Sequence, residues 1–159
     1  MAASDRVGTL TLYSGPDTHT GLTTVVSGIG FTEDGEVPAA PLTEVLTADE
    51  IGRARLIKID VEGGEVAVVP GLERILDEGR GDLEVILEVH TLALEKQGVS
   101  PEDLLRPFTQ RGFNVYSLEN DYRPVAYLAD RFEGRAVRKR DAIDWEMNIV
   151  LSRVDAESI

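Results

Sequence analysis

Short apolar runs alternate with helix-like patterns along the second part of the chain. Runs rich in aliphatic and β-branched residues predict four strands, at 55–61, 83–89, 113–118 and 146–151. Helical spacing of apolar residues predicts a helix over 65–77 that is interrupted near Pro70, and a second from 101 to about 111 with Ser100 as its N-cap. This alternation is typical of βαβ units, so we expect an α/β fold with a mostly parallel sheet and an antiparallel C-terminal strand.

The N-terminal part has a weaker pattern. Residues 7–14 alternate between apolar and polar types and predict a strand, and 22–26 predict a further short one. Residues 27–41 combine Gly, Pro and acidic residues, which predicts a long irregular connection. No periodic pattern extends beyond the last strand. We therefore expect one domain over 1–152 and a flexible tail over 153–159.

Composition narrows the range of partners. The chain has 159 residues, with 29 acidic against 16 basic ones and a net charge of −13. This balance argues against nucleic acid or an anionic membrane as the main partner, although residues 135–140 form one basic cluster. Cys is absent, which excludes disulfides and thiolate chemistry. With no transmembrane run and no signal-peptide pattern, we expect a cytoplasmic protein.

Polar side chains follow two successive predicted strands where each strand ends. Asp60 and Glu62 close the first strand, and Glu88 and His90 close the second. Strand periodicity places the members of each pair on one face of the sheet. Ligands of open α/β sheets bind at the carboxyl ends of the strands, so adjacent strands would bring three carboxylates and an imidazole together there. The Gly63-Gly64 pair would let the backbone turn sharply beside them.

This set of side chains supports three interpretations. A carboxylate and an imidazole can act as base and orienting group toward a substrate hydroxyl. The same set could bind a divalent cation, because several metals accept mixed oxygen and nitrogen ligands. In the purely structural interpretation, Asp60 and Glu62 cap the next helix and His90 satisfies a loop carbonyl.

Other patterns carry less chemistry. Gly28-Ile29-Gly30 resembles the start of a phosphate-binding loop, but neither a buried strand nor a helix flanks it, so we reject that interpretation. The serines lack the setting of a nucleophile elbow. Trp145 and Tyr116 are expected in the core. His19 is expected to be solvated.

The central residues resemble a known family. The runs LIKIDVEGGE at 56–65, VPG at 69–71 and ILEVH at 86–90 are similar to the central block of the FkbM family, and residues 3–13 resemble the segment upstream of it. Members of this family are S-adenosylmethionine-dependent methyltransferases that usually methylate hydroxyl groups of sugars, polyketides and related metabolites. The resemblance implies a Rossmann-like methyltransferase sheet.

The resemblance also implies roles for individual residues. Asp60 and His90 would lie near the acceptor hydroxyl, with Glu88 completing the catalytic set. Asp60, Glu62 and Gly63 would contact the cofactor S-adenosylmethionine. The implied partner is a small-molecule hydroxyl acceptor, and no metal is assigned to this reading of the site.

The resemblance covers the later part of the family's domain. We expect the N-terminal strands to be missing, including the first strand with its Gly-rich turn, through which such enzymes mainly hold their cofactor. The strand at 55–61 would then have an open edge. Three outcomes are expected: a homodimer through this edge, coverage of the edge by residues 7–14, or poor solubility.

Three functional hypotheses follow. The first is an O-methyltransferase of the FkbM type. The second is a non-catalytic α/β module, derived from such an enzyme, that binds a partner or oligomerises. The third is a metal-dependent, hydrolase-like site formed by Asp60, Glu62 and His90.

Overall fold

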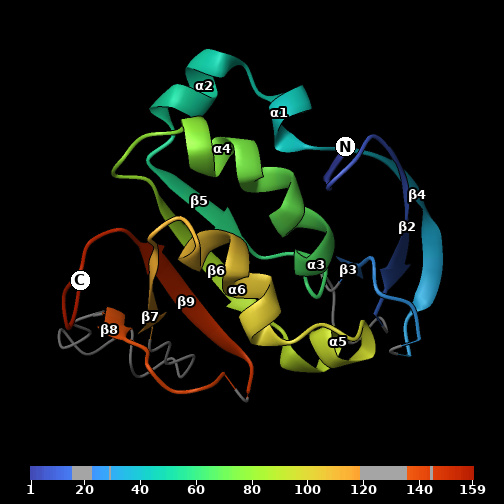
Figure 1. The fold of residues 1–159 in the computed structure, drawn as a ribbon. Coiled ribbons are helices and arrows are strands. Elements are labelled where there is room, and N and C mark those ends of the chain that lie inside the picture. Colours follow the sequence, from blue (N-terminus) through green and yellow to red (C-terminus); the bar gives the residue numbers. More distant parts are fainter. Residues whose placement is uncertain (16–22, 29, 119–135, 144) are drawn as a thin grey trace, which may run out of the picture.

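The computed structural model describes residues 1–15, 23–28, 30–118, 136–143 and 145–159, which form two separate sheets (Figure 1). The N-terminal sheet has the order β1-β4-β2-β3 and the larger sheet the order β5-β6-β9-β7-β8. The strands of the N-terminal sheet are β1 (Ala2–Ala3), β2 (Gly8–Ser14), β3 (Thr23–Thr24) and β4 (Thr32–Ala40). Those of the larger sheet are β5 (Leu56–Ile59), β6 (Glu84–Val89), β7 (Asn114–Leu118), β8 (Ala136–Arg138) and β9 (Met147–Ser152).

The larger sheet is mixed rather than mostly parallel. Strands β5 and β6 are parallel, whereas β9 is antiparallel to both β6 and β7, and β8 is antiparallel to β7. The antiparallel C-terminal strand is therefore confirmed. Because β9 inserts between β6 and β7, two strands that run in the same direction are separated. Among the described residues, this leaves β5–β6 as the one parallel pair of the larger sheet.

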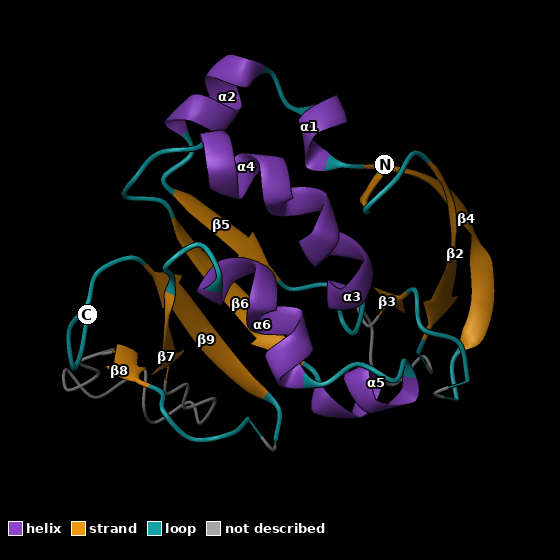
Figure 2. Ribbon diagram, in the orientation of Figure 1, coloured by secondary structure: helices purple, strands orange, loops and turns teal. Residues whose placement is uncertain are grey.

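The helices of the described residues are α1 (Leu42–Val45), α2 (Ala48–Arg53), α3 (Glu65–Val68), the 3-10 helix η1 (Val69–Leu72), α4 (Glu73–Glu78), α5 (Thr91–Lys96) and α6 (Pro101–Thr109). Helices α4 and α6 lie across one face of the larger sheet, with α1 and α2 beyond its upper end and α5 beyond its lower end in Figure 2. Val85, Leu87 and Val89 of β6 are fully buried against side chains of α4, α5 and α6. Among the described residues, no helix is long and apolar enough to cross a bilayer.

Two local predictions about helices are confirmed. Pro70 lies at the start of η1, where α3 gives way to α4, so the predicted interruption is real. Next to it, a Cβ on Gly71 would lie 2.2 Å from the carbonyl oxygen of Ser4, so only glycine lets the N-terminal segment approach this closely. The Oγ of Ser100 accepts a hydrogen bond from the Asp103 N–H at 3.1 Å, as expected of an N-cap.

The expected irregular connection over 27–41 is wrong for most of its length. Strand β4 occupies nine residues there and pairs with β2 from Gly8 to Ser14. Its sequence has little intrinsic β-propensity, with three acids, a Gly and a Pro, so the pairing partner rather than the local sequence makes it a strand. The register of this pair shifts between Leu12 and Tyr13, as at a β-bulge. Gly35, the partner of Leu12, has a φ of +110° and so accommodates the irregularity.

Strand β5 forms an edge of the larger sheet. It pairs with β6, and Leu56 is 55% exposed at this edge. The expected cover by residues 7–14 is wrong. Those residues form β2, which pairs with β3 and β4 in the other sheet, because the β2–β4 pairing satisfies the backbone of both strands.

Residues 153–159, expected as a flexible tail, are instead hydrogen bonded to the end of the larger sheet. Ile159 exchanges two backbone hydrogen bonds with Ala136 of β8, and the Arg138 N–H donates to the Glu157 carbonyl. The Tyr116 hydroxyl donates to the Val154 carbonyl at 2.5 Å. Local sequence could not reveal this because the binding groups are backbone atoms of β8 and one buried hydroxyl.

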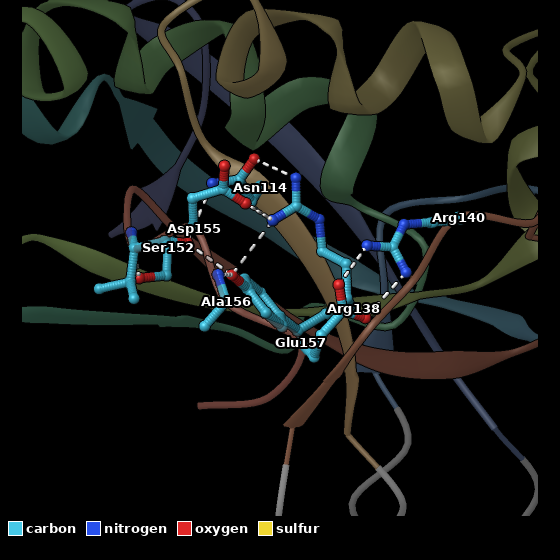
Figure 3. A network of polar contacts seen from close by, with 9 residues as sticks. Asn114, Arg138, Arg140, Ser152, Asp155, Ala156 and Glu157 are labelled. Atoms are coloured by element: carbon cyan, nitrogen blue, oxygen red, sulfur yellow. Dashed lines mark hydrogen bonds and ion pairs between the residues drawn. The ribbon is translucent and has the colours of Figure 1, made fainter.

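The basic cluster contacts acids of the same chain (Figure 3). Arg138 Nη1 lies 2.7 Å from Asp155, and Arg140 donates two hydrogen bonds to Glu157, at 2.6 and 2.9 Å. Tyr116 is buried in the core as predicted, whereas Trp145 is 60% exposed, so its predicted core position is wrong. Trp145 precedes β9 and lies outside its paired register. His19 and Arg135 lie outside the described residues.

Candidate functional site

A tight turn follows β5. The Gly64 N–H donates to the Val61 carbonyl at 3.0 Å, and the two residues between them both have positive φ, +48° at Glu62 and +93° at Gly63. Two positive φ values in this position define a type I′ turn. Glu62 is the only non-glycine residue with positive φ in the described part of the chain. The turn therefore holds the backbone of Glu62 in a left-handed conformation that residues other than glycine rarely adopt.

Contacts from other elements hold this turn in place. Thr24 of β3 donates its hydroxyl to the Glu62 carbonyl at 2.5 Å, and Gln97 at the end of α5 donates its side-chain amide to the Gly63 carbonyl at 2.9 Å. A Cβ on Gly63 would lie 2.8 Å from the Cβ of Ala93. Gly63 is therefore required both for its φ and for the close packing of α5 against the turn.

The predicted convergence of side chains at the ends of β5 and β6 is present. The His90 Nε2 atom lies 3.6 Å from Glu62 Oε2 and 3.9 Å from Glu88 Oε2. One donor atom from each of these three residues lies within 4.8 Å of the other two. Parallel pairing of the two strands brings their carboxyl ends to the same edge, which explains why the sequence revealed this group.

Asp60 joins the same group through Glu88. Its carboxylate is 2.6 Å from Lys58 Nζ, and hydrogen bonds from Lys58 and with Glu88 hold the pKa of Asp60 below its usual value. Burial, followed by the hydrogen bond and the charge of Asp60, raises the pKa of Glu88 to about 7. We name the group of Asp60, Glu62, Glu88 and His90 the carboxylate–histidine cluster.

A further residue of this site was not found from the sequence. Glu146 Oε2 lies 3.3 Å from the Nδ1 atom of His90. The register explains the contact: Val89 of β6 is opposite Met147 of β9, so Glu146 comes opposite His90. Nothing in the local sequence indicates which strand lies beside β6, so Glu146 could be recognised only once the order of strands was known.

Glu65 lies behind the turn and is completely buried. Its Oε1 atom accepts a hydrogen bond from the Gly63 N–H at 3.2 Å, and burial raises the pKa of its carboxyl. His90 and then Glu62 are the charged side chains that act on it most strongly. Among the described residues, Glu65 Oε2 and His90 Nε2 are the buried side-chain atoms without a hydrogen-bond partner.

The structural interpretation of these residues does not hold. Helix α3 begins after Gly64 without a hydrogen bond from any capping side chain, so neither Asp60 nor Glu62 serves as its cap. The imidazole of His90 faces carboxylates rather than a loop carbonyl. Capping of α3 therefore does not account for the positions of these side chains.

A separate cavity of about 200 Å³ lies between the N-terminal sheet and α3. Its walls are mainly apolar and include Leu10, Leu12, Val61 and Val68. None of the four cluster residues lines it. The polar chemistry of the site is thus at the rim of the larger sheet and not in this cavity.

Comparison with known proteins gives one match. Residues 2–115 match the family model described as the methyltransferase FkbM domain. The match spans the N-terminal sheet, β5, β6, the turn and the whole carboxylate–histidine cluster, and it excludes Glu146. Neither a curated protein nor a solved structure matches the chain.

Proposed function

Since the chain belongs to the FkbM methyltransferase family, we propose that it provides the acceptor side of an S-adenosylmethionine-dependent O-methyltransferase. The acceptor is a hydroxyl group of a small molecule or sugar. The observation that carries this proposal is the carboxylate–histidine cluster, held at the carboxyl edge of β5 and β6 within the part of the chain that matches the family. We also propose that the larger sheet is the later part of a Rossmann-like sheet, which the position of the cluster supports.

Methyl transfer to a hydroxyl oxygen requires a proton acceptor. The new oxygen–carbon bond forms as the sulfur–carbon bond of the sulfonium breaks, and the hydroxyl proton leaves to a base. Asp60 is the base that we assign. Its ion pair with Lys58 keeps it in the carboxylate form, and its side chain is 37% exposed, so an acceptor can reach it. Glu88 on the neighbouring strand and His90 just after it would orient the hydroxyl.

The charge of the cluster suits the proposed cofactor. S-adenosylmethionine would supply an activated methyl group on a positively charged sulfonium. Asp60, Glu62 and Glu88 place carboxylates at one rim, and a protein potential of that sign favours a cation. We assign Asp60, Glu62 and Gly63 to cofactor contact. The type I′ turn fixes the Glu62 side chain and the Gly63 backbone for this role.

Calorimetric titration with S-adenosylmethionine, followed by transfer of its labelled methyl group, tests this function. The acceptor set would comprise common monosaccharides and a hydroxylated macrolactone. We expect micromolar cofactor binding and label in at least one acceptor. Asp60→Asn should reduce transfer by a factor of about 10² or more, because proton transfer contributes on that scale.

Asp82→Asn is the matched control for this variant. Asp82 precedes β6 at the opposite end of the sheet and pairs with Arg80, so its loss should leave transfer unchanged. Absence of both cofactor binding and label transfer would overturn the proposed function. Equal transfer by the wild-type chain and Asp60→Asn would overturn the role of Asp60 alone.

The open edge of β5 favours a second candidate, an oligomerisation module that forms a homodimer. This edge strand has exposed residues at Leu56 and Lys58, and its outer backbone groups can pair with a second copy. Size-exclusion chromatography with light scattering would measure the mass of the chain. Leu56→Lys should shift a dimer to monomer, whereas Val7→Lys, at a residue that is 74% exposed and away from this edge, should not. A monomeric wild-type chain would contradict this candidate.

A further inference from the structure

Two buried side-chain atoms of the described residues, Glu65 Oε2 and His90 Nε2, have no hydrogen-bond partner. Both belong to residues that flank the site of the turn at 61–64. A buried polar atom without a partner costs free energy, and native structures contain few of them. The orphaned atom of His90 lies among donor atoms of Glu62 and Glu88, which points to a binding partner at this position.

The geometry around His90 Nε2 is that of a set of ligands. Glu62 Oε2 and Glu88 Oε2 lie 3.6 and 3.9 Å from this nitrogen, too far for a hydrogen bond. Two donor atoms bound to one ion at roughly 2.0–2.2 Å are themselves roughly 3–4.3 Å apart. Small movements of the two carboxylates would therefore place all three donors around one cation.

The opposite nitrogen of His90 also lies close to a carboxylate. Nδ1 is 3.3 Å from Glu146 Oε2, so a proton on Nδ1 would face this oxygen and leave Nε2 to bind a cation. Metal-binding histidines commonly donate their other N–H to a carboxylate in this way. Nε2 faces two carboxylates, and a cation held among the three groups would be attracted to both of them.

Glu65 adds an independent observation. Its side chain is completely buried and its Oε2 atom has no partner. The Gly63 N–H holds the other oxygen and so fixes the carboxylate behind the turn.

We propose that Glu62, Glu88 and His90 form a divalent-cation site, with Glu146 as the positioning residue that orients the imidazole. Two carboxylates and one imidazole suit Mn²⁺ or Zn²⁺, whereas Ca²⁺ takes six to eight oxygen ligands. Three protein ligands leave further coordination positions open, as in catalytic rather than structural sites. The acceptor hydroxyl would bind the cation at such a position, with Asp60 beside it, and this step rests on the proposed function. The cation site itself does not rest on the proposed function.

Calorimetric titration of the full chain with MnCl₂, ZnCl₂ and CaCl₂, after treatment with a chelator, tests the site. We expect one Mn²⁺ or Zn²⁺ per chain at micromolar affinity, an increase in melting temperature on saturation, and binding of Ca²⁺ at least tenfold weaker. Glu88→Gln and His90→Asn should each weaken binding at least tenfold. Circular dichroism would establish that each variant is folded, and Glu62→Gln provides a third ligand variant should one of them fail to fold.

Two matched controls separate this site from adventitious binding. Glu84→Gln changes an acid on the same strand and face as Glu88, four residues away, and should bind the cation as the wild-type chain does. His19→Asn removes the only other histidine of the chain and should also bind normally. Unchanged affinity in His90→Asn, or no binding by the wild-type chain, would overturn the inference. The metal titration contains neither S-adenosylmethionine nor an acceptor, so its result does not depend on the proposed function. A chain that binds the cation but transfers no methyl group in the separate assay would count against the proposed function alone.

Discussion

Glu146 and His90 meet across two antiparallel strands, with Glu146 Oε2 3.3 Å from His90 Nδ1. His90 follows β6 and Glu146 precedes β9, so the contact exists only when β9 is inserted beside β6. A carboxylate in this position would favour a proton on Nδ1, which would leave Nε2 to bind a cation.

The variant Glu146→Ala tests that relationship. In the wild-type chain without metal, ¹⁵N chemical shifts of His90 should show the Nδ1–H tautomer, and Glu146→Ala should lose this preference. Cation affinity should fall roughly 10–100-fold, the range found when a group that orients a metal ligand is removed. Glu84→Gln serves again as the control. A predominant Nε2–H tautomer in the wild-type chain would contradict the assignment.

The sequence predicted the parts of the site that depend on local pattern. Asp60, Glu62, Glu88 and His90 each end a strand with a clear apolar run, and the rule for parallel strands brings such ends together. Glu146 was missed because its place depends on strand order, which no local pattern records. Strand β4 was missed for a related reason: its nine residues become a strand through pairing with β2.

Prediction of burial was less successful where long-range contacts decide it. Residues 153–159 have no periodic pattern, yet the hydroxyl of Tyr116 and the backbone of β8 bind them. Trp145 was expected in the core from its residue type, but it lies beyond the paired part of β9 and is exposed. In both cases the deciding contact, or its absence, involves residues far away in the sequence.

Gly63 should be the least replaceable residue of the turn. Alanine there would adopt a φ of +93° and place its Cβ 2.8 Å from that of Ala93. Gly112→Ala is the matched control, because Gly112 has a similar φ of +77° with no atom within 4 Å of the added Cβ. The control should lose about 1–2 kcal/mol of unfolding free energy, the cost of the left-handed conformation, and Gly63→Ala should lose more. Equal losses in urea unfolding would contradict the crowding against α5.

Tyr116→Phe should release the C-terminal residues without disturbing the core. The hydroxyl donates to the Val154 carbonyl at 2.5 Å and accepts from the Ala156 N–H at 3.2 Å, while the ring is buried. Loss of this hydroxyl should cost about 1–3 kcal/mol because buried partners are left unpaired. Amide hydrogen exchange should accelerate at Ala156 and Ile159 and remain unchanged in β5. Unchanged exchange at Ala156 would show that other contacts hold the segment.

The ion pair between α4 and the end of α6 should make stability depend on pH. Arg111 Nε donates to Asp77 Oδ1 at 2.7 Å, and this bond holds the pKa of Asp77 below its ordinary value. A carboxyl whose pKa is lower in the folded state stabilises the fold above its ordinary pKa of about 3.8 and loses this contribution as the pH falls through the folded value. Asp77→Asn should therefore be less stable than the wild-type chain at pH 6, and the difference should shrink by pH 3. Urea unfolding at pH 6, 4 and 3 would measure this trend, with Glu102→Gln as a charge-matched control at an exposed position of α6. A difference that stays constant from pH 6 to pH 3 would show that Asp77 acts through packing rather than through its charge.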